Sequence, residues 1–588
     1  METIYREGAL SVSANIALSV RVCARALAES LTEYTFDLAW DAESTEAGQV
    51  RVLWELPCIG AQYMWHPDAR IQRVLESDWR QKHQSMLTGS APLAIAFNDA
   101  DENVCAFAAS EVRKVASLHL GAHDADNTLH ADFRMSLHQF RGQPPRTQIR
   151  IRADFRRIPF HQAIGDACRW WDETLRIRPL PVPESCFKPL YSTWYNFHQA
   201  VTAEKIEREC ALAKQLGMET VIVDDGWQSE HDGRGYGYTG DWNVCAGKFP
   251  DIAGHVRRVH ALGMKYMLWY SVPFIGYHAA NFPRFEKKLL RRIDRNECGV
   301  LDPRYPDVRA YLIGIYEHAV RAYGLDGLKL DFIDQFEDVE QAPLRPEMDY
   351  ACVQEAAERL MNDVTERLRA IRPEIMIEFR QRYIGPMMHR FGNMFRVGDC
   401  ASDIVMNRVC IADLRLIGGG AATHSDMLTW NNGESVEDAA LQILNSIFGV
   451  IQFSQIIEQM PESHLRMTRF WLNFARENEK VLLYSEFIPQ EPQFLYPVLR
   501  AQDADTAIIG VYAPNKIIAI QGAHARLKLI NATHAEEICL RFARPCAARL
   551  VIRSAMGEIV RTERRAFRAA IETVSVPCSG LAELELEK

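Results

Sequence analysis

One central segment of the chain reads Gly324-Leu-Asp-Gly-Leu-Lys-Leu-Asp-Phe-Ile-Asp334, an apolar run that ends in polar residues. Side chains two apart on a β-strand point the same way, so Lys329 and Asp331 are expected on one face. A cation beside a carboxylate holds that carboxylate in its ionised form. The segment therefore predicts a buried strand that presents an ionised acid where the strand gives way to a loop.

The same layout recurs through the middle of the chain, where short apolar runs end in polar or aromatic groups. The predicted strands lie at 191–195, 220–227, 264–270, 324–334, 375–380, 394–399, 421–426 and 449–454. Helical periodicity predicts helices at 203–216, 304–323, 348–371, 402–416, 437–448 and 463–477. Strands that alternate with helices indicate βαβ units and a parallel sheet. Eight such units in about 290 residues predict a (β/α)8 TIM barrel, whose chemistry lies at the carboxyl ends of the strands.

Both flanks of this region show a different pattern. Residues 1–180 carry period-two alternation in short runs, which predicts an antiparallel β-sandwich, followed by a linker helix at 159–175 and a proline-rich stretch at 178–183. Alternation returns towards the end of the chain. We therefore expect a multidomain α/β protein with an N-terminal β-sandwich (1–180), a (β/α)8 catalytic barrel (185–482) and a small C-terminal β-sandwich (483–588).

Composition limits the class of protein. The 588 residues are 48% hydrophobic and 24% charged, which is typical of a soluble globular protein. A net charge of −10 without a long basic run argues against nucleic acid as a partner. No apolar run approaches the ~20 residues of a membrane span, and the N-terminus lacks the layout of a secretory signal. These features predict a cytoplasmic enzyme that has no membrane partner.

The cysteine pattern does not indicate a bound metal. The fourteen cysteines are scattered, without a CxxC pair or a spacing typical of a zinc cage or a disulfide framework. His424-Ser-Asp426 could suggest a metal or a catalytic triad, but no second histidine at ligand spacing and no G-x-S-x-G elbow accompany it. We expect His424 to be structural or to support a neighbouring site residue, and we predict neither a metal nor a cofactor.

Two acids at predicted strand ends suggest glycoside chemistry. Retaining hydrolysis needs one carboxylate as nucleophile and a second carboxyl as acid/base across a sugar-sized pocket. Asp331 ends the fourth predicted strand and Asp399 the sixth, so both would face one barrel mouth. Taken singly, each Asp is more often a strand or helix cap. The pair, with Lys329 beside Asp331, favours the catalytic interpretation.

Other polar and aromatic groups occupy equivalent positions. Asp224 and Asp225 could accept hydrogen bonds from paired sugar hydroxyls, and the Trp227 indole could pack on a sugar ring. The alternative for this motif is an Asp-Asp-Gly turn beside a core tryptophan. Trp269 is likewise either a core residue or a sugar platform. Glu378, Arg380 and Arg382 either form a structural ion pair or bind hydroxyls and the surroundings of the nucleophile.

These residues together resemble the α-galactosidases of glycoside hydrolase family 36, the melibiase-like enzymes. The motifs that carry the resemblance are Trp194-Tyr-Asn-Phe197, Gly217-Met-Glu-Thr-Val-Ile-Val-Asp-Asp-Gly-Trp227, Gly240-Asp-Trp242, Lys248-Phe-Pro250, Gly263-Met-Lys, Leu268-Trp269, Lys329-Leu-Asp331, Arg396-Val-Gly-Asp-Cys-Ala-Ser-Asp403, Asn407-Arg408 and His424-Ser-Asp-Met-Leu-Thr-Trp430. Two segments depart from the family pattern. Glu378-Phe-Arg-Gln-Arg-Tyr-Ile-Gly-Pro386 replaces a Cys-x-x-Gly-x-x-Arg type segment, and Tyr270-Ser-Val-Pro-Phe274 replaces Glu-Pro-Glu-Met.

The resemblance implies a retaining α-glycosidase that hydrolyses terminal α-linked galactose from an oligosaccharide or glycoside. Asp331 would be the nucleophile and Asp399 the acid/base, with Asp403 as the rival for the second role. Asp224, Asp225, Trp269 and Lys329 would hold the galactose. Family members are commonly homo-oligomers and need no metal. The alternatives are a raffinose-synthase type galactosyl transferase, an α-N-acetylgalactosaminidase, and a sugar-binding protein without catalysis.

Overall fold

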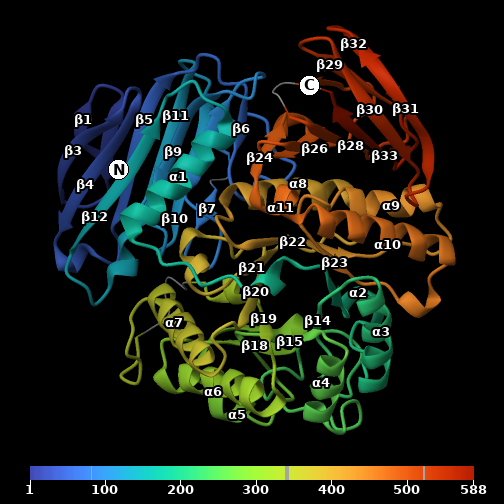
Figure 1. Cartoon of the computed structure of the whole chain (residues 1–588). Helices are drawn as coiled ribbons and strands as arrows, with labels where there is room; N and C mark the ends of the chain where they lie inside the picture. Colours follow the sequence, from blue (N-terminus) through green and yellow to red (C-terminus); the bar gives the residue numbers. More distant parts are fainter. Residues whose placement is uncertain (81–82, 338–343, 521–523, 588) are drawn as a thin grey trace.

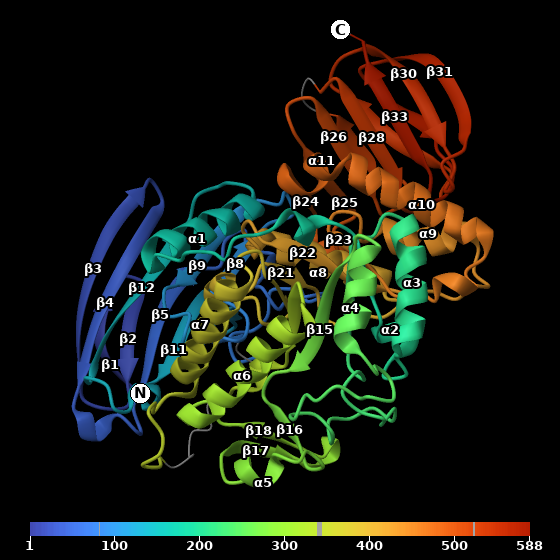
Figure 2. The ribbon, with the colours of Figure 1, turned by 60° about the horizontal axis from the view of Figure 1, so that its bottom comes forward.

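The computed structural model describes residues 1–80, 83–337, 344–520 and 524–587. In Figure 1 the barrel lies below two regions rich in β-sheet, the N-terminal one at upper left and the C-terminal one at upper right. Figures 1 and 2 show the N-terminal sheets beside α1 and α7, and the C-terminal sheets beside α9, α10 and α11. The predicted order of β-sandwich, barrel and β-sandwich is therefore confirmed.

The barrel is closed by eight parallel strands in chain order. They are β13 (Leu190–Ser192), β14 (Thr220–Val223), β15 (Lys265–Ser271), β19 (Gly327–Asp331), β20 (Met376–Arg380), β21 (Met394–Arg396), β22 (Ala422–Leu428) and β23 (Val450–Phe453). Each lies within or beside a predicted strand. Every residue of β19 is buried, as expected for a strand covered on both faces.

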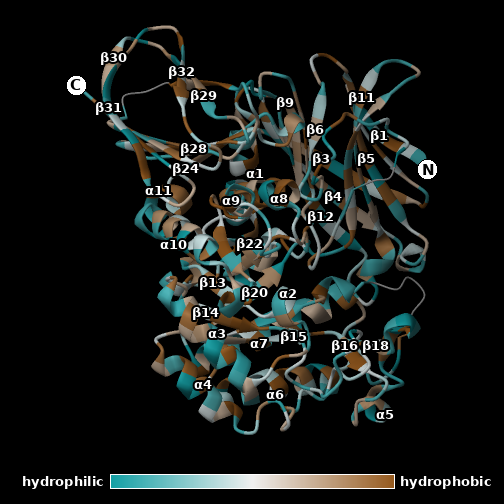
Figure 3. Ribbon diagram, turned by 90° about the vertical axis from the view of Figure 1, so that its right-hand side faces the viewer, coloured by the Kyte–Doolittle hydropathy of each residue, from teal (hydrophilic) through white to brown (hydrophobic). Residues whose placement is uncertain are grey.

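Helices pack around the outside of the barrel strands. Their bounds are α2 (Trp194–Phe197), α3 (Ala203–Gln215), α4 (Ile252–Ala261), α5 (Phe282–Phe285), α6 (Pro306–Tyr323), α7 (Val353–Ile371), α8 (Ile404–Ile417), α9 (Val436–Leu444), α10 (Glu462–Glu477) and α11 (Glu479–Tyr484). Figure 3 shows hydrophobic residues along the barrel strands and hydrophilic residues on outer helices such as α4. Within the described residues, no helix has both the length and the apolar character needed to cross a bilayer.

Two features of the barrel were not predicted from the sequence. Helix α4 has only ten residues after a long loop, so its apolar spacing was too short to detect. An antiparallel sheet of β16 (Phe274–Gly276), β18 (Cys298–Leu301) and β17 (Leu289–Ile293) follows β15. Gly276 permits this insertion, because a Cβ there would lie 2.1 Å from the carbonyl oxygen of Gly237.

The N-terminal region consists of two six-stranded sheets whose inner faces share an apolar core. One sheet runs β1 (Glu2–Glu7), β2 (Leu10–Ala14), β5 (Gln49–Pro57), β11 (Thr128–Ser136), β10 (Ala116–His123) and β7 (Gln84–Ser85). The other runs β3 (Leu18–Ala28), β4 (Leu31–Trp40), β12 (Arg146–Asp154), β9 (Asn103–Ala109), β8 (Leu93–Phe97) and β6 (Tyr63–Trp65). Helix α1 (Phe160–Leu175) matches the predicted linker helix.

The C-terminal region has a seven-stranded and a three-stranded sheet around their own core. The larger runs β24 (Glu486–Gln490), β25 (Val498–Gln502), β26 (Thr506–Val511), β28 (Arg526–Asn531), β33 (Leu581–Leu586), β30 (Cys546–Arg553) and β31 (Ile559–Phe567). The smaller runs β27 (Ile517–Ile520), β29 (Glu537–Phe542) and β32 (Ile571–Ser575). We keep 1–180, 185–482 and 483–588 as proposed domain limits, with residues 521–523 and 588 outside the described part.

One buried carboxylate joins all three regions. Asp413 of α8 is fully buried and accepts two hydrogen bonds from Arg73 Nη2, at 2.9 and 2.7 Å. Trp65 of β6 donates to it at 2.8 Å, and Tyr496, which precedes β25, donates at 2.6 Å. Asp413 therefore satisfies donors from the N-terminal and C-terminal regions at one point in the barrel wall.

Asp413→Ala is expected to destabilise the chain by about 3–5 kcal/mol, because it leaves the Arg73 guanidinium buried without its counter-charge. Chemical denaturation followed by tryptophan fluorescence measures the change in midpoint. Asp505→Ala, which removes an exposed acid paired with Arg526, is the matched control and should change stability by about 0–1 kcal/mol. Equal effects of the two substitutions would contradict the proposed junction.

Candidate active site

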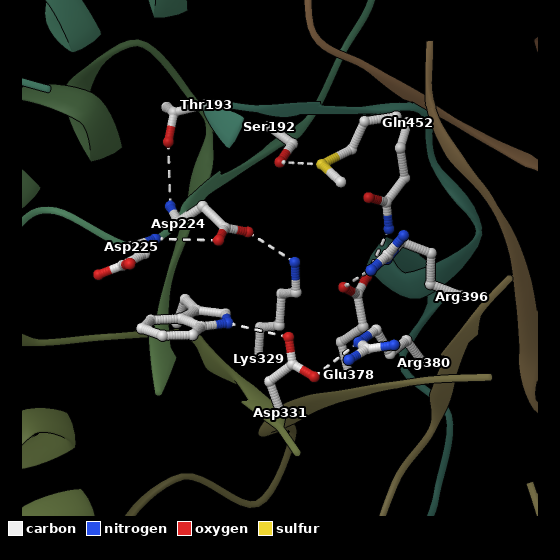
Figure 4. Close-up of polar contacts among 12 residues, drawn as sticks. Ser192, Thr193, Asp224, Asp225, Lys329, Asp331, Glu378, Arg380, Arg396 and Gln452 are labelled. Atoms are coloured by element: carbon white, nitrogen blue, oxygen red, sulfur yellow. Dashed lines mark hydrogen bonds and ion pairs between the residues drawn. The ribbon is translucent and has the colours of Figure 1, made fainter. Parts of the chain in front are cut away.

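Asp331 ends β19 inside the barrel mouth and is tightly held. Its Oδ1 accepts hydrogen bonds from Arg380 Nε at 2.7 Å and from the Tyr383 hydroxyl at 2.5 Å. Its Oδ2 accepts one from Trp269 Nε1 at 3.1 Å. Figure 4 shows the Asp331 carboxylate with the Arg380 guanidinium beside it.

The surroundings of Asp331 keep it ionised. Burial alone would raise its pKa, since only 7% of the side chain is exposed. The charges of Arg380 and Lys329, together with the donated hydrogen bonds, outweigh burial and hold the pKa well below its ordinary value. Asp331 is therefore a carboxylate at neutral pH, the state that a nucleophile requires.

Lys329 shares the inward face of β19 with Asp331, as predicted, but its direct partner is different. Its Nζ lies 2.6 Å from Oδ2 of Asp224, which follows β14 (Figure 4). The cation in contact with Asp331 is Arg380 of β20. Lys329 has the expected effect of keeping Asp331 ionised, but without a direct contact, because inward side chains of neighbouring barrel strands meet in layers across the barrel. Lys329 still acts on Asp331 through its charge.

Asp224 and Asp225 are adjacent in sequence, but their carboxylates accept hydrogen bonds from different donors. Asp224 accepts from Lys329, while Asp225 accepts from the side-chain amides of Gln199 and Gln228, both at 2.7 Å. Burial raises the pKa of Asp225 to about 6. Gly226 makes this turn possible, since its φ is +115° and a Cβ there would lie 2.4 Å from Gln199 Cα.

Asp399 follows β21 and lies at the open side of the cluster. Its carboxylate accepts from Arg396 Nη2 at 2.8 Å, and 54% of the side chain is exposed. Burial would raise its pKa, but Arg396 and Arg380 hold that pKa below the ordinary value. Asp331 and Asp399 both raise the pKa of Arg380, so the two acids act on one guanidinium. The barrel thus brings the two predicted catalytic acids into one charged cluster.

Three other residues predicted for the site lie outside this cluster. Trp227 is fully buried, donates from Nε1 to the Trp269 carbonyl at 3.0 Å and stacks on Trp242, so it exposes no ring to a ligand. Arg382 lies 3.6 Å from Asp68 of the N-terminal region and lines a cavity of about 500 Å³ against the sandwich. Asp403 is the exposed N-cap of α8 and accepts from the Met406 amide at 2.9 Å. His424 is buried and its ring lies 2.8 Å from the Cys186 carbonyl, which is consistent with the role predicted for it.

Several partners of the acids were not assigned a role from the sequence. Arg396 is buried between Asp399 and Asp426 and lies 3.9 Å from Glu378. Gln452 of β23 donates to Glu378 across the barrel, and Tyr383 reaches Asp331 from the loop after β20. The sequence carried a signal for these contacts. Glu378 and Arg380 are charged residues at alternate positions of β20, and Arg380 pairs in register with Arg396 of β21.

Glu378 is the buried acid beneath this layer. Burial raises its pKa to about 7, although Lys329 and Arg396 act in the opposite direction. An acid whose pKa is raised in the folded state binds more protons there than in the unfolded chain. Its contribution to stability is therefore highest in acid and falls as pH rises from the unfolded value towards 7.

Glu378→Gln is expected to become more stable relative to the parent as pH rises, by at most about 1.4 kcal/mol for each pH unit between the two pKa values. The measurement is the difference in unfolding midpoint between variant and parent at about pH 5 and about pH 8. Glu558→Gln, at an exposed acid paired with Arg466, serves as control. A difference for Glu378→Gln that does not change with pH would contradict the assignment.

Part of the sequence is similar to known proteins. A family model described as melibiase matches residues 186–382. Alpha-galactosidase Mel36A of Lactobacillus acidophilus is 30% identical over 148 residues, which are 24% of this chain and 19% of that protein. Alpha-galactosidase AgaA of Geobacillus stearothermophilus is 26% identical over 204 residues, 32% of this chain and 26% of that protein. The matched stretches thus span about a fifth to a quarter of these relatives' length.

Solved structures extend the likeness to the whole chain. The crystal structure of the GH36 α-galactosidase AgaA from Geobacillus stearothermophilus has a TM-score of 0.64 at 16% identity, covering 98% of this chain and 83% of that one. The α-galactosidase from Lactobacillus brevis has a TM-score of 0.62 at 14% identity, covering 100% of this chain and 84% of that one. At this identity the agreement shows a shared fold that includes both flanking regions.

Proposed function

We propose that this protein, whose barrel carries a melibiase domain and whose fold is that of the family 36 α-galactosidases, is a retaining glycosidase that releases terminal α-linked galactose. The supporting observation is the ionised Asp331, which accepts hydrogen bonds from three side chains in the barrel mouth. The charge of Asp399 acts on Arg380, one of these three donors. Structures of AgaA variants in complex with raffinose and with stachyose show that this fold accommodates galactose-containing oligosaccharides in that protein. We extend that substrate class to this chain.

In the first step Asp331 attacks the anomeric carbon and Asp399 protonates the departing glycosidic oxygen. The product is a glycosyl ester of Asp331 and the free aglycone alcohol. We expect attack through Oδ2, because Oδ1 already accepts hydrogen bonds from Arg380, Tyr383 and the Phe332 amide. Oδ2 accepts only the longer bond from Trp269 among the side chains of the described residues.

In the second step Asp399 takes a proton from water, which attacks the same carbon and restores the Asp331 carboxylate. The pKa of Asp399, held low by Arg396 despite burial, suits this base role at neutral pH. The first step needs the protonated form of Asp399, so it is favoured as pH falls. If the leaving oxygen displaces Arg396 from Asp399, the pKa of Asp399 rises and its protonation becomes easier.

The galactose subsite is proposed to consist of Asp224, Asp225, Trp269 and Lys329. The Lys329 ion pair fixes Asp224, and the two glutamine amides fix Asp225, so both carboxylates are oriented before a sugar binds. Trp227 supports the subsite from behind through its bond to the Trp269 carbonyl. A nitrophenyl-glycoside panel of sugar epimers in both anomers tests the assignment. Fastest release from the α-galactoside supports it, and activity confined to another epimer contradicts it.

We further propose that the protein works in the cytoplasm as a homo-oligomer. The fourteen cysteines are scattered, without a CxxC pair or the spacing of a disulfide framework, which suits a reducing compartment. Oligomerisation rests on the resemblance to the family. A mass in solution equal to the 67.1 kDa of one chain would contradict it.

Azide can assign the two acids separately. With Asp331→Ala and an activated aryl α-galactoside, azide should enter from the vacated face and give the inverted β-galactosyl azide. With Asp399→Ala the glycosyl-enzyme still forms, so azide should give the retained α-galactosyl azide. Hydrolysis of unactivated substrates should fall by about 10²–10⁴-fold in Asp399→Ala, since the general acid is lost.

Asp403→Ala is the matched control for the acid/base assignment. This exposed helix cap should keep near-parental activity and give no azide product. Proton NMR of the products distinguishes the anomers. Retained azide product from Asp403→Ala, with full activity in Asp399→Ala, would move the acid/base role to Asp403. Full activity in Asp331→Ala would contradict the double displacement.

A further inference from the structure

A second group of potential ligands lies in the N-terminal sandwich, away from the barrel. Asp78, His123 and His130 each direct one ligand atom into a common space, and these atoms all lie within 4.8 Å of one another. Across residues 1–80, 83–337, 344–520 and 524–587, no other group of three or more His, Cys, Asp or Glu side chains meets this condition. The group belongs to no part of the proposed hydrolase.

The register of one hairpin places the two histidines together. Strands β10 and β11 pair antiparallel, with Gly121 opposite His130 and His123 opposite Thr128. His123 is two residues from Gly121, so its side chain lies on the same face as that of His130. The two imidazole rings stack with centroids 4.6 Å apart and planes 14° apart.

Gly121 allows a third segment to approach this hairpin closely. A Cβ at Gly121 would lie 2.6 Å from Asp78 Cα, which no other residue type could tolerate without displacing the chain. The Asp78 amide donates to the Ala122 carbonyl at 3.0 Å, which fixes the segment in place. As a result, Oδ2 of Asp78 lies 3.1 Å from Nδ1 of His123 and 2.9 Å from Nδ1 of His130.

This geometry is close to that of a metal site. Zn²⁺ binds imidazole nitrogen and carboxylate oxygen at about 2.0–2.2 Å, so ligand atoms around a tetrahedral ion lie about 3.3 Å apart. The two distances from Asp78 to the histidines differ from this value by a few tenths of an ångström. Three protein ligands and an open position for water are a common zinc arrangement.

The surroundings of the three side chains allow a positively charged ion to reach them. The His123 side chain is 34% exposed, which opens the site to solvent, whereas His130 is 7% exposed. Arg134, a cation on the same strand as His130, lies 2.8 Å from Asp132 and is paired with that acid. A divalent ion would take the place of the hydrogen bond between Asp78 and His123.

We propose that Asp78, His123 and His130 bind one divalent transition-metal ion, with Zn²⁺ as the preferred ion, and that this ion fastens residues 76–78 to the β10–β11 hairpin. Two nitrogen ligands and one oxygen ligand suit Zn²⁺, Co²⁺ and Ni²⁺ better than Mg²⁺ or Ca²⁺. The expectation of no metal, which rested on cysteine spacing and on His424, did not consider this cluster.

The test uses the full chain after treatment with EDTA and removal of the chelator. Competition with a chromophoric chelator should show one equivalent of Zn²⁺ bound per chain. His123→Gln and Asp78→Asn should each weaken binding by at least about tenfold, because each removes one of three ligands. His534→Gln removes an exposed histidine paired with Asp438 at 2.8 Å, so it should leave Zn²⁺ affinity unchanged.

Co²⁺ substitution excludes binding by cysteine. The parent protein should show visible d–d bands without the near-ultraviolet charge-transfer band of a cobalt–thiolate bond. Zn²⁺ should also raise the thermal unfolding midpoint of the parent and of His534→Gln, but not that of His123→Gln. If Asp78→Asn fails to fold, His123→Gln decides the test, since its side chain is partly exposed.

Three outcomes would overturn the proposal. They are binding of less than one equivalent of Zn²⁺ to the parent, affinity that is unchanged in His123→Gln, and a thiolate band in the Co²⁺ spectrum. In those cases the Asp78, His123 and His130 cluster is a hydrogen-bonded group that holds no metal.

Discussion

A charge inside a protein is tolerated only beside a partner, and this constraint organises the mouth of the barrel. Asp331 is buried with Arg380, and Asp224 with Lys329. Arg396 lies between Asp399 and Asp426. The Asp331–Arg380, Asp224–Lys329 and Arg396–Asp426 pairs each join two different strands or the loops beyond them, so these pairs depend on the assembled barrel. The same pairs set the pKa values on which the proposed chemistry depends.

Turns and aromatic rings hold this layer in position. The left-handed Gly226 turn brings Gln199 against Asp225, and the Trp227 indole fixes the Trp269 carbonyl. Trp269 in turn donates to Asp331. The Asp413 junction anchors the wall of the barrel to both flanking regions. The flanking sheets are therefore part of the support of the barrel rather than loosely attached modules.

The departures from the family motifs fall in two segments that lie beside the proposed nucleophile. The segment after β20 supplies Arg380 and Tyr383, both of which bind Asp331. The segment after β15 leads into the antiparallel sheet, whose Phe274 stacks on Phe332 next to Asp331. Substitution of these two segments therefore changes the immediate neighbours of the proposed nucleophile. The melibiase match ends at residue 382, within the first of them.

The sequence by itself determined the eight barrel strands, the two β-rich flanks and the positions of Asp331, Asp399 and the Asp224-Asp225 pair. These follow from local periodicity and from polar residues at strand ends, which do not depend on distant contacts. Only the tertiary structure decided that Lys329 pairs with Asp224, that Arg380 contacts Asp331, and that Trp227 is buried. The tertiary structure also decided that Asp78 lies beside His123 and His130. These residues are far apart in sequence, and their contact depends on strand register and on the absence of a side chain at Gly121. Partners across a barrel or a hairpin are set by closure and register, and sequence periodicity specifies which face a residue occupies but not what lies opposite.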